Sequence, residues 1–577
     1  SDGSLSGAGN IAIGDSAAKA LTSGSNAIAI GRDTMSAAVF TGTDAIAIGR
    51  SALASLTSGD RNTFVGALSG DALTQGARNV GLGYGALTSD TLGSKSIAVG
   101  HGALFNQNFT TATDAFNVAV GHDAGVSVTT GFNNTLIGGK AGDAITSGDN
   151  NVAVGVNALT ADTLGDRNVA IGAAALASQN FTTSTDVYNV GVGYLAGYSI
   201  TTGQQNTILG GLAGDALTDA DYNVAIGTSA LSADTLGSRA VAIGRNALIA
   251  QNFTTATNNY NVAVGYSAGG AITTGVQNTL IGGVAGDAIT DADRNVGLGY
   301  NALTTNTVGS RSVAIGTSAL SVQNPATATD MYNTAVGDDC GKLMTTGTRN
   351  TLVGGLAGDA ITTGDQNTVL GALALSEETT GEYSVAVGYQ ALAVQNSTTG
   401  ASMYNTAVGY KAGFSVTTGT QNTFIGGLAG DVLTASDYNV AVGYSSLSTD
   451  TLGARSVAVG HEALASQNFT TATISYNTAV GMQAGRLVTT GTQLTLIGYN
   501  SGTALTTGAT NTAVGTNSLA SDTLGSKSTA IGVQALNTQN FTTATDTYNV
   551  ALGHQASLNV TTGVHNTIVG ANAGDAF

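Results

Sequence analysis

The amino-acid sequence predicts an all-β fold, a parallel β-solenoid, and three observations lead to it. A five-residue box, Asn-Val-Ala-Val-Gly at 151–155, returns with small changes 32 times along the 577 residues. From residue 79 the boxes repeat every 72 residues, with spacings of 17, 21, 17 and 17 inside each period. Each box ends in Gly after Val, Ile or Leu, which is typical of a short strand that ends in a turn.

The units between boxes must stack on one another. Ordering a residue costs about 1.5 kcal/mol, while burying a Val or Leu side chain returns about 1.5–3 kcal/mol, so a 17-residue unit cannot fold alone. We therefore expect 32 coils, or rungs, of about 17–21 residues in one elongated domain, a rod. Residues 1–78 are expected to be irregular leading rungs, and residues 79–577 are expected to be seven 72-residue super-repeats.

The four rungs of a period, numbered one to four, are illustrated by residues 151–167, 168–188, 189–205 and 206–222. After each box, Ala or Ser followed by Leu or Gly predicts a second short strand, as at 156–159. Corners such as Thr-Leu-Gly at 163–165 predict turns in which Gly has a positive φ. The Asn that opens most boxes is expected either to form a hydrogen-bonded ladder along the stack or to serve as a tolerant turn residue.

Box positions three and four point to opposite faces of the strand, yet both are apolar. Because a soluble monomer does not expose so long an apolar stripe, one face is expected to meet other chains. Ala dominates position three, as expected where coils approach closely around an axis, and a cyclic homotrimer, intertwined or side by side, is the simplest closed assembly. The predicted interface residues are Ala153, Ala263, Leu136, Ile208, Leu280, Leu352 and Phe424. The bulky residues of rung four are expected to be matched by the small Gly139 and Gly211.

Composition argues against several classes of partner. The net charge is −18 and the pI is near 4.3, with no run of Lys or Arg, so neither nucleic acid nor an anionic membrane is expected to bind. No apolar run approaches the roughly 20 residues that cross a bilayer, so we expect no membrane insertion by this segment. The single Cys340 excludes an intrachain disulfide framework and is expected to be a small buried residue.

One stretch carries a family resemblance: Asn-Thr-Ala-Val-Gly-Tyr at 405–410, followed by Thr-Thr-Gly at 417–419. The tandem boxes resemble the head of YadA-like trimeric autotransporter adhesins, and the longer form is similar to repeats in phage tail fibres. The similarity covers nearly all of residues 10–577. It implies a left-handed parallel β-roll trimer, whereas it constrains function weakly because such rods serve as stalk, spacer or binding head.

The candidate polar sites are sparse. Residues 138–143 superficially resemble a calcium-binding repeat, but Ala replaces one Gly and the segment recurs only once per 72 residues. Turn capping is therefore preferred over ions between chains for the acidic residues that share this rung position: Asp71, Asp143, Asp215, Asp287, Asp359, Asp431 and Asp575. The five His residues are scattered, at positions 101, 122, 461, 554 and 565, so we expect no catalytic site, no metal site and no cofactor.

Rung two carries four extra residues, which are expected to bulge outward. Its Gln-Asn-Phe-Thr-Thr segment loses Phe only at Pro325 and Ser397, and this tolerance predicts an exposed, multivalent contact rather than a core. The predicted contact residues are Phe109, Phe181, Phe253, Phe469 and Phe541. The aromatic that closes rung two, such as Tyr188, is expected to pack under the bulge. Variable residues after the box Gly predict an outward turn that is solvated or binds a ligand: Tyr84, Tyr194, Tyr266, Tyr300 and Tyr444.

These observations predict a structural fibre and adhesin that projects from a cell or virion surface. We expect an extracellular homotrimer that attaches multivalently to a host or surface glycan or protein. A phage or phage-like tail fibre for host recognition is the alternative. An ice- or mineral-binding solenoid is a distant one, since the Thr pairs sit at Gly corners rather than on a flat strand face.

Overall fold

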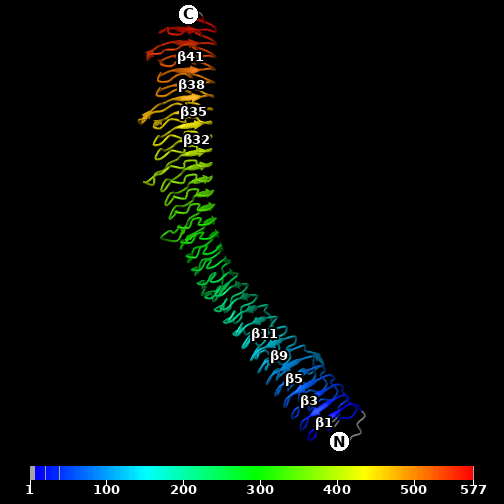
Figure 1. Cartoon of the computed structure of the whole chain (residues 1–577). Helices are drawn as coiled ribbons and strands as arrows, with labels where there is room; N and C mark the ends of the chain where they lie inside the picture. Colours follow the sequence, from blue (N-terminus) through cyan, green and yellow to red (C-terminus); the bar gives the residue numbers. More distant parts are fainter. Residues whose placement is uncertain (1–6, 20, 38, 576–577) are drawn as a thin grey trace. The chain divides into compact units, whose positions relative to one another are not determined.

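The computed structural model describes residues 7–19, 21–37 and 39–575, and all regular secondary structure in them is β-strand. The chain divides into two compact units, residues 1–291 and 292–577, and each is a stack of coils (Figure 1). Within each unit successive boxes pair in parallel and in register, as in Ala153 with Ala170. The predicted parallel β-solenoid is thus confirmed. Among the described residues no helix is long and apolar enough to cross a membrane.

Unit 1 (blue to green in Figure 1) contains 16 of the 32 box strands and three short accessory strand pairs, β6–β8, β12–β14 and β18–β20. Its strands are β1 (Ile11–Ile13), β2 (Ile28–Ile30), β3 (Ile46–Ile48), β4 (Thr63–Val65), β5 (Val80–Leu82), β6 (Gly93–Ser94), β7 (Ile97–Val99), β8 (Thr113–Asp114), β9 (Val118–Val120), β10 (Thr135–Ile137), β11 (Val152–Val154), β12 (Gly165–Asp166), β13 (Val169–Ile171), β14 (Thr185–Asp186), β15 (Val190–Val192), β16 (Thr207–Leu209), β17 (Val224–Ile226), β18 (Gly237–Ser238), β19 (Val241–Ile243), β20 (Thr257–Asn258), β21 (Val262–Val264) and β22 (Thr279–Ile281). In the leading rungs β1 to β5 pair in the same register, although residues 1–6, 20 and 38 lie outside the described residues.

Unit 2 (green to red in Figure 1) contains the other 16 box strands and the accessory pairs β24–β26, β34–β36 and β40–β42. Its strands are β23 (Val296–Leu298), β24 (Gly309–Ser310), β25 (Val313–Ile315), β26 (Thr329–Asp330), β27 (Thr334–Val336), β28 (Thr351–Val353), β29 (Thr368–Leu370), β30 (Val385–Val387), β31 (Thr406–Val408), β32 (Thr423–Ile425), β33 (Val440–Val442), β34 (Gly453–Ala454), β35 (Val457–Val459), β36 (Thr473–Ile474), β37 (Thr478–Val480), β38 (Thr495–Ile497), β39 (Thr512–Val514), β40 (Gly525–Ser526), β41 (Thr529–Ile531), β42 (Thr545–Asp546), β43 (Val550–Leu552) and β44 (Thr567–Val569).

The Gly that closes each box ends the strand for a steric reason. Gly155 has a φ of 139°, and a Cβ built on it would lie 2.5 Å from the carbonyl oxygen of Gly172 on the next rung. Only glycine fits a backbone that turns and stacks this closely. By contrast the corner Gly165 does not have the predicted positive φ; a Cβ there would lie 2.2 Å from Asp162 Oδ2, so this Gly is required by close approach.

The predicted second strand does not form. Residues 156–159 are turn residues, with positive φ at Asn157 (56°) and Leu159 (52°). The Leu159 N–H donates to the Ala175 carbonyl of the next rung at 3.0 Å, so these turns stack on one another without extended backbone. Each coil therefore has one box strand, to which rungs one and two of six periods add a two-residue accessory strand, and the turns stack between them.

The box Asn residues form a ladder between successive rungs. Asn151 Oδ1 accepts the backbone N–H of Asn168 at 2.9 Å, and Asn151 Nδ2 donates to the Gly165 carbonyl of its own coil at 2.9 Å. An amide-to-amide hydrogen bond from Asn168 Nδ2 to Asn151 Oδ1 follows at 3.1 Å. The predicted ladder is confirmed, although its most regular bonds run from side chain to backbone.

The narrow interior alternates large and small side chains between rung types. In rung one, Ala153 and Leu159 are both fully buried. In rung four, position three carries the larger Leu136. One of its methyl carbons lies 2.6 Å from a Cβ built on Gly125, and the other lies 2.8 Å from a Cβ built on Gly142. The small partners of Leu136 are therefore these two glycines, whereas Gly139, predicted for that role, has no atom within 4 Å of a built Cβ.

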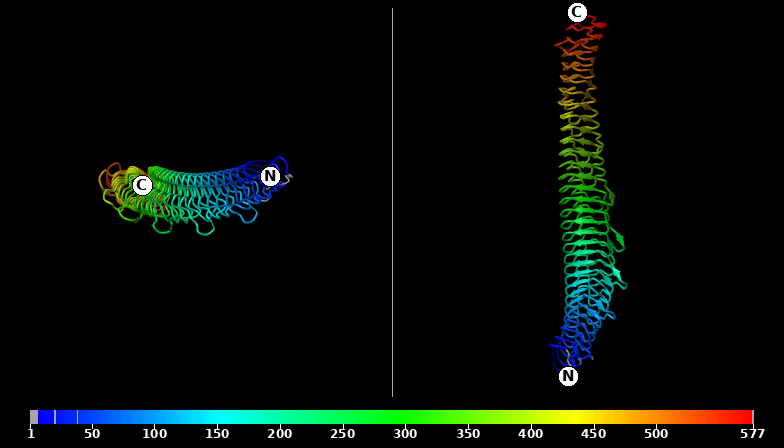
Figure 2. Two further views of the ribbon diagram at one scale, coloured as in Figure 1. Left: turned by 90° about the horizontal axis from the view of Figure 1, so that it is seen from below. Right: turned by 90° about the vertical axis from the view of Figure 1, so that its right-hand side faces the viewer.

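The extra residues of rung two lie outside the regular coil. Two-residue strands such as β14 pair with the preceding corner at β12. Between Phe181 and β14, Thr182, Thr183 and Ser184 are exposed. Loops project from the edge of the unit 1 stack in both views of Figure 2, so the predicted outward bulge is confirmed.

Candidate functional site

Box positions two and four form one face of the strand column. In β11, Val152 and Val154 are partly exposed, whereas Ala153 between them is buried. Position four stacks in register from Ile137 to Val154 to Ile171, and the two Ile side chains are 37% and 38% exposed. Similar aliphatic side chains occupy position four of every box strand in each unit. The result is a long apolar strip on the surface of a single chain.

This arrangement overturns the predicted interface. Every residue assigned to it is fully buried inside its own coil: Ala153, Ala263, Leu136, Ile208, Leu280, Leu352 and Phe424. Strand alternation correctly places positions three and four on opposite faces, but the small residue belongs to the interior. The interior of a 17-residue coil is so narrow that Ala occupies position three in most rungs, and the larger position-four side chains face outward.

The residues that follow the box Gly form an outward turn beside this strip, as predicted. Tyr84, Tyr194, Tyr266, Tyr300 and Tyr444 are 47–61% exposed. Rings on successive rungs stack, with centroids 5.2 Å apart for Tyr84 and His101 and 5.9 Å apart for Tyr389 and Tyr410. Aromatic rings therefore stack in short groups of two or three, and other residue types such as Ala173, Gly211 and Thr228 separate these groups at the same position. A ligand-binding role for the Tyr residues remains a prediction.

The rung-two Phe side chains are core residues, contrary to the prediction. Phe109, Phe181, Phe253, Phe469 and Phe541 are only 5–6% exposed. Where Phe is replaced, a larger neighbour compensates: Met331 accompanies Pro325 and Met403 accompanies Ser397, whereas Ala115 and Val187 accompany Phe109 and Phe181. Met331 and Pro325 each have an atom 3.1 Å from a Cβ built on Gly309. In the preceding period, Phe253 packs over the equivalent glycine, Gly237. Replacement of Phe therefore does not indicate exposure.

A buried polar group beneath each bulge was missed by sequence reasoning. Asp162 Oδ2 accepts the Gln179 Nε2 hydrogen bond at 2.6 Å, and Oδ1 accepts the backbone N–H groups of Gly165 (3.0 Å) and Phe181 (3.2 Å). Gln179 Oε1 in turn accepts Asn189 Nδ2 at 2.8 Å. Burial raises the pKa of Asp162, and these hydrogen bonds partly offset the rise.

The signal for this polar group is periodic in the sequence. An acidic residue three positions before the corner Gly recurs every 72 residues, with an amide in one period only: Asp90, Asp162, Asp234, Asn306, Glu378, Asp450 and Asp522. The Gln of rung two recurs with it. These residues stabilise the bulge and, being buried, are not a surface site.

The aromatics that close rung two lie on the surface rather than under the bulge. They are all about half exposed: Phe116, Tyr188, Tyr260, Tyr332, Tyr404, Tyr476 and Tyr548. The Arg167 guanidinium lies 5.6 Å from the ring centroid of Tyr188, and its Nη1 donates to the Tyr188 hydroxyl at 3.1 Å. Arg167 also pairs with Asp186 of β14. A Lys or Arg from the rung below thus contacts the closing aromatic in six of the seven periods, whereas Tyr404 stacks on Tyr383 with ring centroids 5.1 Å apart.

The shared acidic position of rung four contacts the next rung. The Thr88 and Thr160 hydroxyls donate to Asp71 and Asp143, so these bonds run between rungs rather than within one turn as predicted. Oδ1 of Asp215, Asp359 and Asp431 is buried without a hydrogen-bond partner. Burial raises the pKa of all three carboxyls, to about 6 for Asp431.

Cys340 is fully buried at the rung position where most coils have Ala. Desolvation raises the pKa of its thiol to about 12. A thiol that stays protonated at neutral pH is a poor nucleophile. The prediction of a small buried residue is confirmed.

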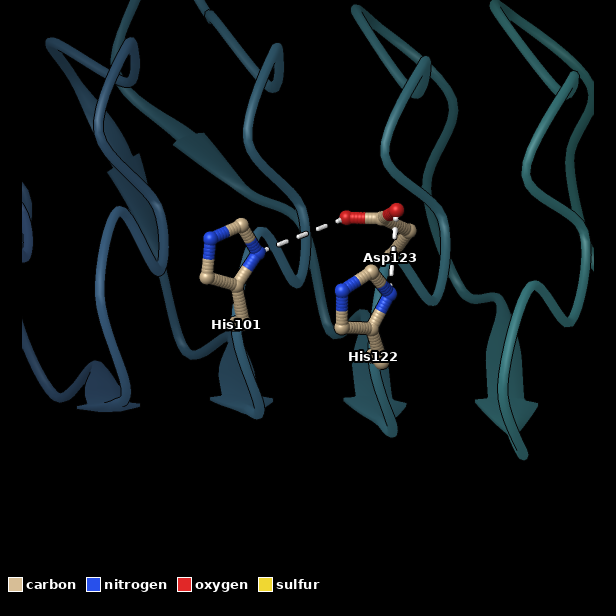
Figure 3. Close-up of side chains that lie close together, drawn as sticks. All are labelled: His101, His122 and Asp123. Atoms are coloured by element: carbon tan, nitrogen blue, oxygen red, sulfur yellow. Dashed lines mark ion pairs between the residues drawn. The ribbon is translucent and has the colours of Figure 1, made fainter.

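Two of the scattered His residues meet on the surface of unit 1. His101 and His122 follow the box Gly on consecutive rungs, and their rings stack with centroids 4.9 Å apart. Both turn Nδ1 toward Asp123 (Figure 3), at 3.0 Å for His122 and 3.7 Å for His101. The 21-residue separation, one rung-two length, was the available signal for this cluster.

Comparison with known proteins does not assign the chain to a family. No protein-family model matches it, and no curated protein sequence matches it significantly.

Proposed function

We propose that the chain is a structural, non-catalytic subunit that associates with copies of itself through the box face and acts as an extracellular fibre and adhesin. One observation carries this proposal: the apolar strip at box position four, which a single chain leaves partly exposed along each unit. Soluble monomers rarely leave so large an apolar surface uncovered. A second copy presents the same strip, and a homotrimer closes three of them around an axis.

The adhesive surface in this proposal is the turn column that carries the exposed Tyr residues. Tyr offers a rigid aromatic face with a hydroxyl at one end, a combination suited to sugar rings and protein surfaces. The five Tyr residues are separated by two to eight rungs, and several weak contacts spaced along the chain add through avidity. The partner is then a surface receptor or glycan of a cell; a phage-like tail fibre would use the same surface for host recognition.

Ice binding would require a flat face of regularly spaced Thr. Thr does occupy position two of β27, β28 and β29, at Thr334, Thr351 and Thr368. The next strand, β30, has Val385 there, and position four remains aliphatic throughout these strands. The Thr residues therefore form only one column, which Val385 interrupts, and no second Thr column lies beside it in these strands. The adhesin proposal is preferred for this reason.

Charge on the strip tests the proposed assembly. Ile137→Glu with Ile171→Glu should convert the wild-type oligomer to monomers in sedimentation velocity while the β-sheet circular dichroism is retained, because both side chains already contact water. Ala170→Glu is the matched control; it buries an unpaired charge in the coil, so it should unfold unit 1 locally. A monomeric wild-type protein, or an oligomer of unchanged mass in the double variant, would refute the assembly.

Adhesion is tested separately on the oligomer. Replacing Tyr84, Tyr194, Tyr266, Tyr300 and Tyr444 by Ser should weaken binding to a glycan array or to cells without a change in oligomer mass. The closing residues Tyr188, Tyr260 and Tyr332, replaced by Ser, provide an equally exposed aromatic control. Equal loss in both sets would show that the turn column is not the specific surface.

A further inference from the structure

His101, His122 and Asp123 are placed by the ladder of unit 1. β7 and β9 pair in register, so the residues that follow each box are superposed on consecutive rungs. The Asp123 N–H donates to the His101 carbonyl at 2.8 Å, which fixes the two turns against each other. The ring planes differ by only 6°, and Tyr84 stacks on the other face of His101 at 5.2 Å. The three side chains are thus held by backbone hydrogen bonds and ring stacking.

The donor atoms of the three side chains lie close together. Nδ1 of His122 lies 3.0 Å from Asp123 Oδ2, and Nδ1 of His101 lies 3.7 Å from Oδ1. Donor atoms of all three residues lie within 4.8 Å of one another, and Figure 3 shows both imidazoles turned to the same carboxylate. Ligands about 2.0–2.2 Å from a tetrahedral ion are roughly 3.3–3.5 Å apart. Each imidazole faces a different oxygen of the Asp123 carboxylate, so small side-chain rotations bring one oxygen and both nitrogens to that spacing.

Gly102 supplies a second, independent observation. A Cβ built on Gly102 would lie 2.5 Å from Asp123 Oδ1. The matching position one period later is Ala174, with a φ of 54° close to the 67° of Gly102, so the turn itself does not require glycine. The absent side chain leaves room for the carboxylate to lean toward His101. The site therefore includes a space as well as three ligands.

We propose that His101, His122 and Asp123 bind one divalent transition-metal ion between two consecutive rungs. Two imidazole nitrogens and a carboxylate favour Zn²⁺, Ni²⁺ or Cu²⁺ over Ca²⁺ and Mg²⁺, which take oxygen ligands. The two rings are 56% and 64% exposed, so the remaining coordination positions face solvent and are open to water or to a donor group of a ligand. The ion links two turns and places positive charge on a chain whose net charge is −18.

Zinc binding to the full chain tests this proposal. Equilibrium dialysis with ZnCl₂ and elemental analysis should give one saturable Zn²⁺ per chain. His101→Gln with His122→Gln should weaken that binding by tenfold or more, since two of the three ligands are lost. Gly102→Ala should also weaken it, by about 10–100-fold, because the added Cβ displaces the carboxylate while all three ligands remain.

The matched control is His461→Gln in unit 2. His461 occupies the same rung position as His101 and lies 4.0 Å from Glu462, but the next rung carries Met482 where unit 1 has His122. Zinc binding should survive this change. No saturable binding in the wild type, equal binding in the double-His variant, or equal weakening in His461→Gln would each overturn the site. Circular dichroism confirms the fold of each variant, and ions counted per chain do not depend on oligomeric state.

Discussion

Asp431 makes the stability of unit 2 depend on pH. Its Oδ1 is buried without a hydrogen-bond partner, and burial raises the pKa of the carboxyl to about 6, partly offset by a hydrogen bond to its own backbone and by the charge of Lys411. Between pH 4 and pH 6 the folded chain therefore holds a proton that the unfolded chain has released. Stability contributed by this group falls as the pH rises through that window and stays low above it.

Asp431→Asn should raise the unfolding temperature at pH 7. The gain is expected to be on the order of 1 kcal/mol, because solvent still reaches part of this half-buried side chain and reduces the effect. Below pH 4 the gain should vanish, since the wild-type carboxyl is then protonated in both states. Thermal unfolding followed by circular dichroism from about pH 3 to pH 7 measures this. Asp143→Asn, which retains an oxygen for the Thr160 hydroxyl, tests whether the amide alone changes stability.

Phe181→Ser should destabilise unit 1 by about 2–4 kcal/mol, because it empties a buried site. Adding Val187→Met should restore part of the loss, since Met403 accompanies Ser397 at the equivalent position, directly before the closing Tyr404. A shallow hollow lined by Ser397, Thr398 and Met403 indicates that the compensation is incomplete. Urea unfolding midpoints measure both effects. An unchanged midpoint for Phe181→Ser would restore the view that these rings are surface contacts.

Sequence reasoning identified the box strands because Gly and an aliphatic residue recur without exception. Sequence reasoning could not decide which face of the strand points inward. Ala153 and Val154 are both apolar, and only the narrow width of the coil determines that the smaller residue is inside. The same reasoning misplaced Phe181 because the Met residues at 331 and 403, which compensate for the loss of Phe, lie six residues along the chain and contact this site only in the folded coil. His101 and His122 come together only once the rung-two length is counted between them.

The four rungs of a period differ in what they bury. Eleven residues after the box Asn lies an interior position that differs between rungs. Rung one has Asp162 there and rung two has Gln179, whereas rungs three and four have aliphatic residues. Gln179 Nε2 needs the carboxylate directly below it, at 2.6 Å. Rung two therefore stacks well on rung one and poorly on the other rung types, even though every box has the same backbone.

Deleting rung one of the second period, residues 151–167, should destabilise unit 1 by several kcal/mol. The boxes would still pair, but Gln179 would lie on Ile145 and the Phe181 N–H would lose its acceptor. Each unpaired buried polar group costs about 1–3 kcal/mol. The accessory strand β14 would also lose β12. The unfolding temperature measures the loss, and a value equal to that of the wild type would show that rung types are interchangeable.

Whole periods, in contrast, should be removable. In a stack where each rung contacts only its neighbours, stability is approximately a sum of rung and interface terms. Deleting residues 151–222 joins rung four of one period to rung one of the next, the junction that the wild type already uses. Deleting residues 151–222 should change the unfolding temperature far less than deleting residues 151–167 does, although the longer deletion removes more residues. The reverse order would contradict the nearest-neighbour account.

The pairing of Asp162 with Gln179 also limits which rungs can stack on each other if the chain folds out of register. A shift by one or two rungs sets the Gln179 amide against an aliphatic side chain, and a shift by three sets it against another Gln, Gln107. A shift by four restores the pairing of an acidic residue with Gln. Copying or losing the stretch of gene that encodes four rungs would likewise leave every interior neighbour unchanged. The number of periods can then vary by unequal recombination while the fold is inherited intact.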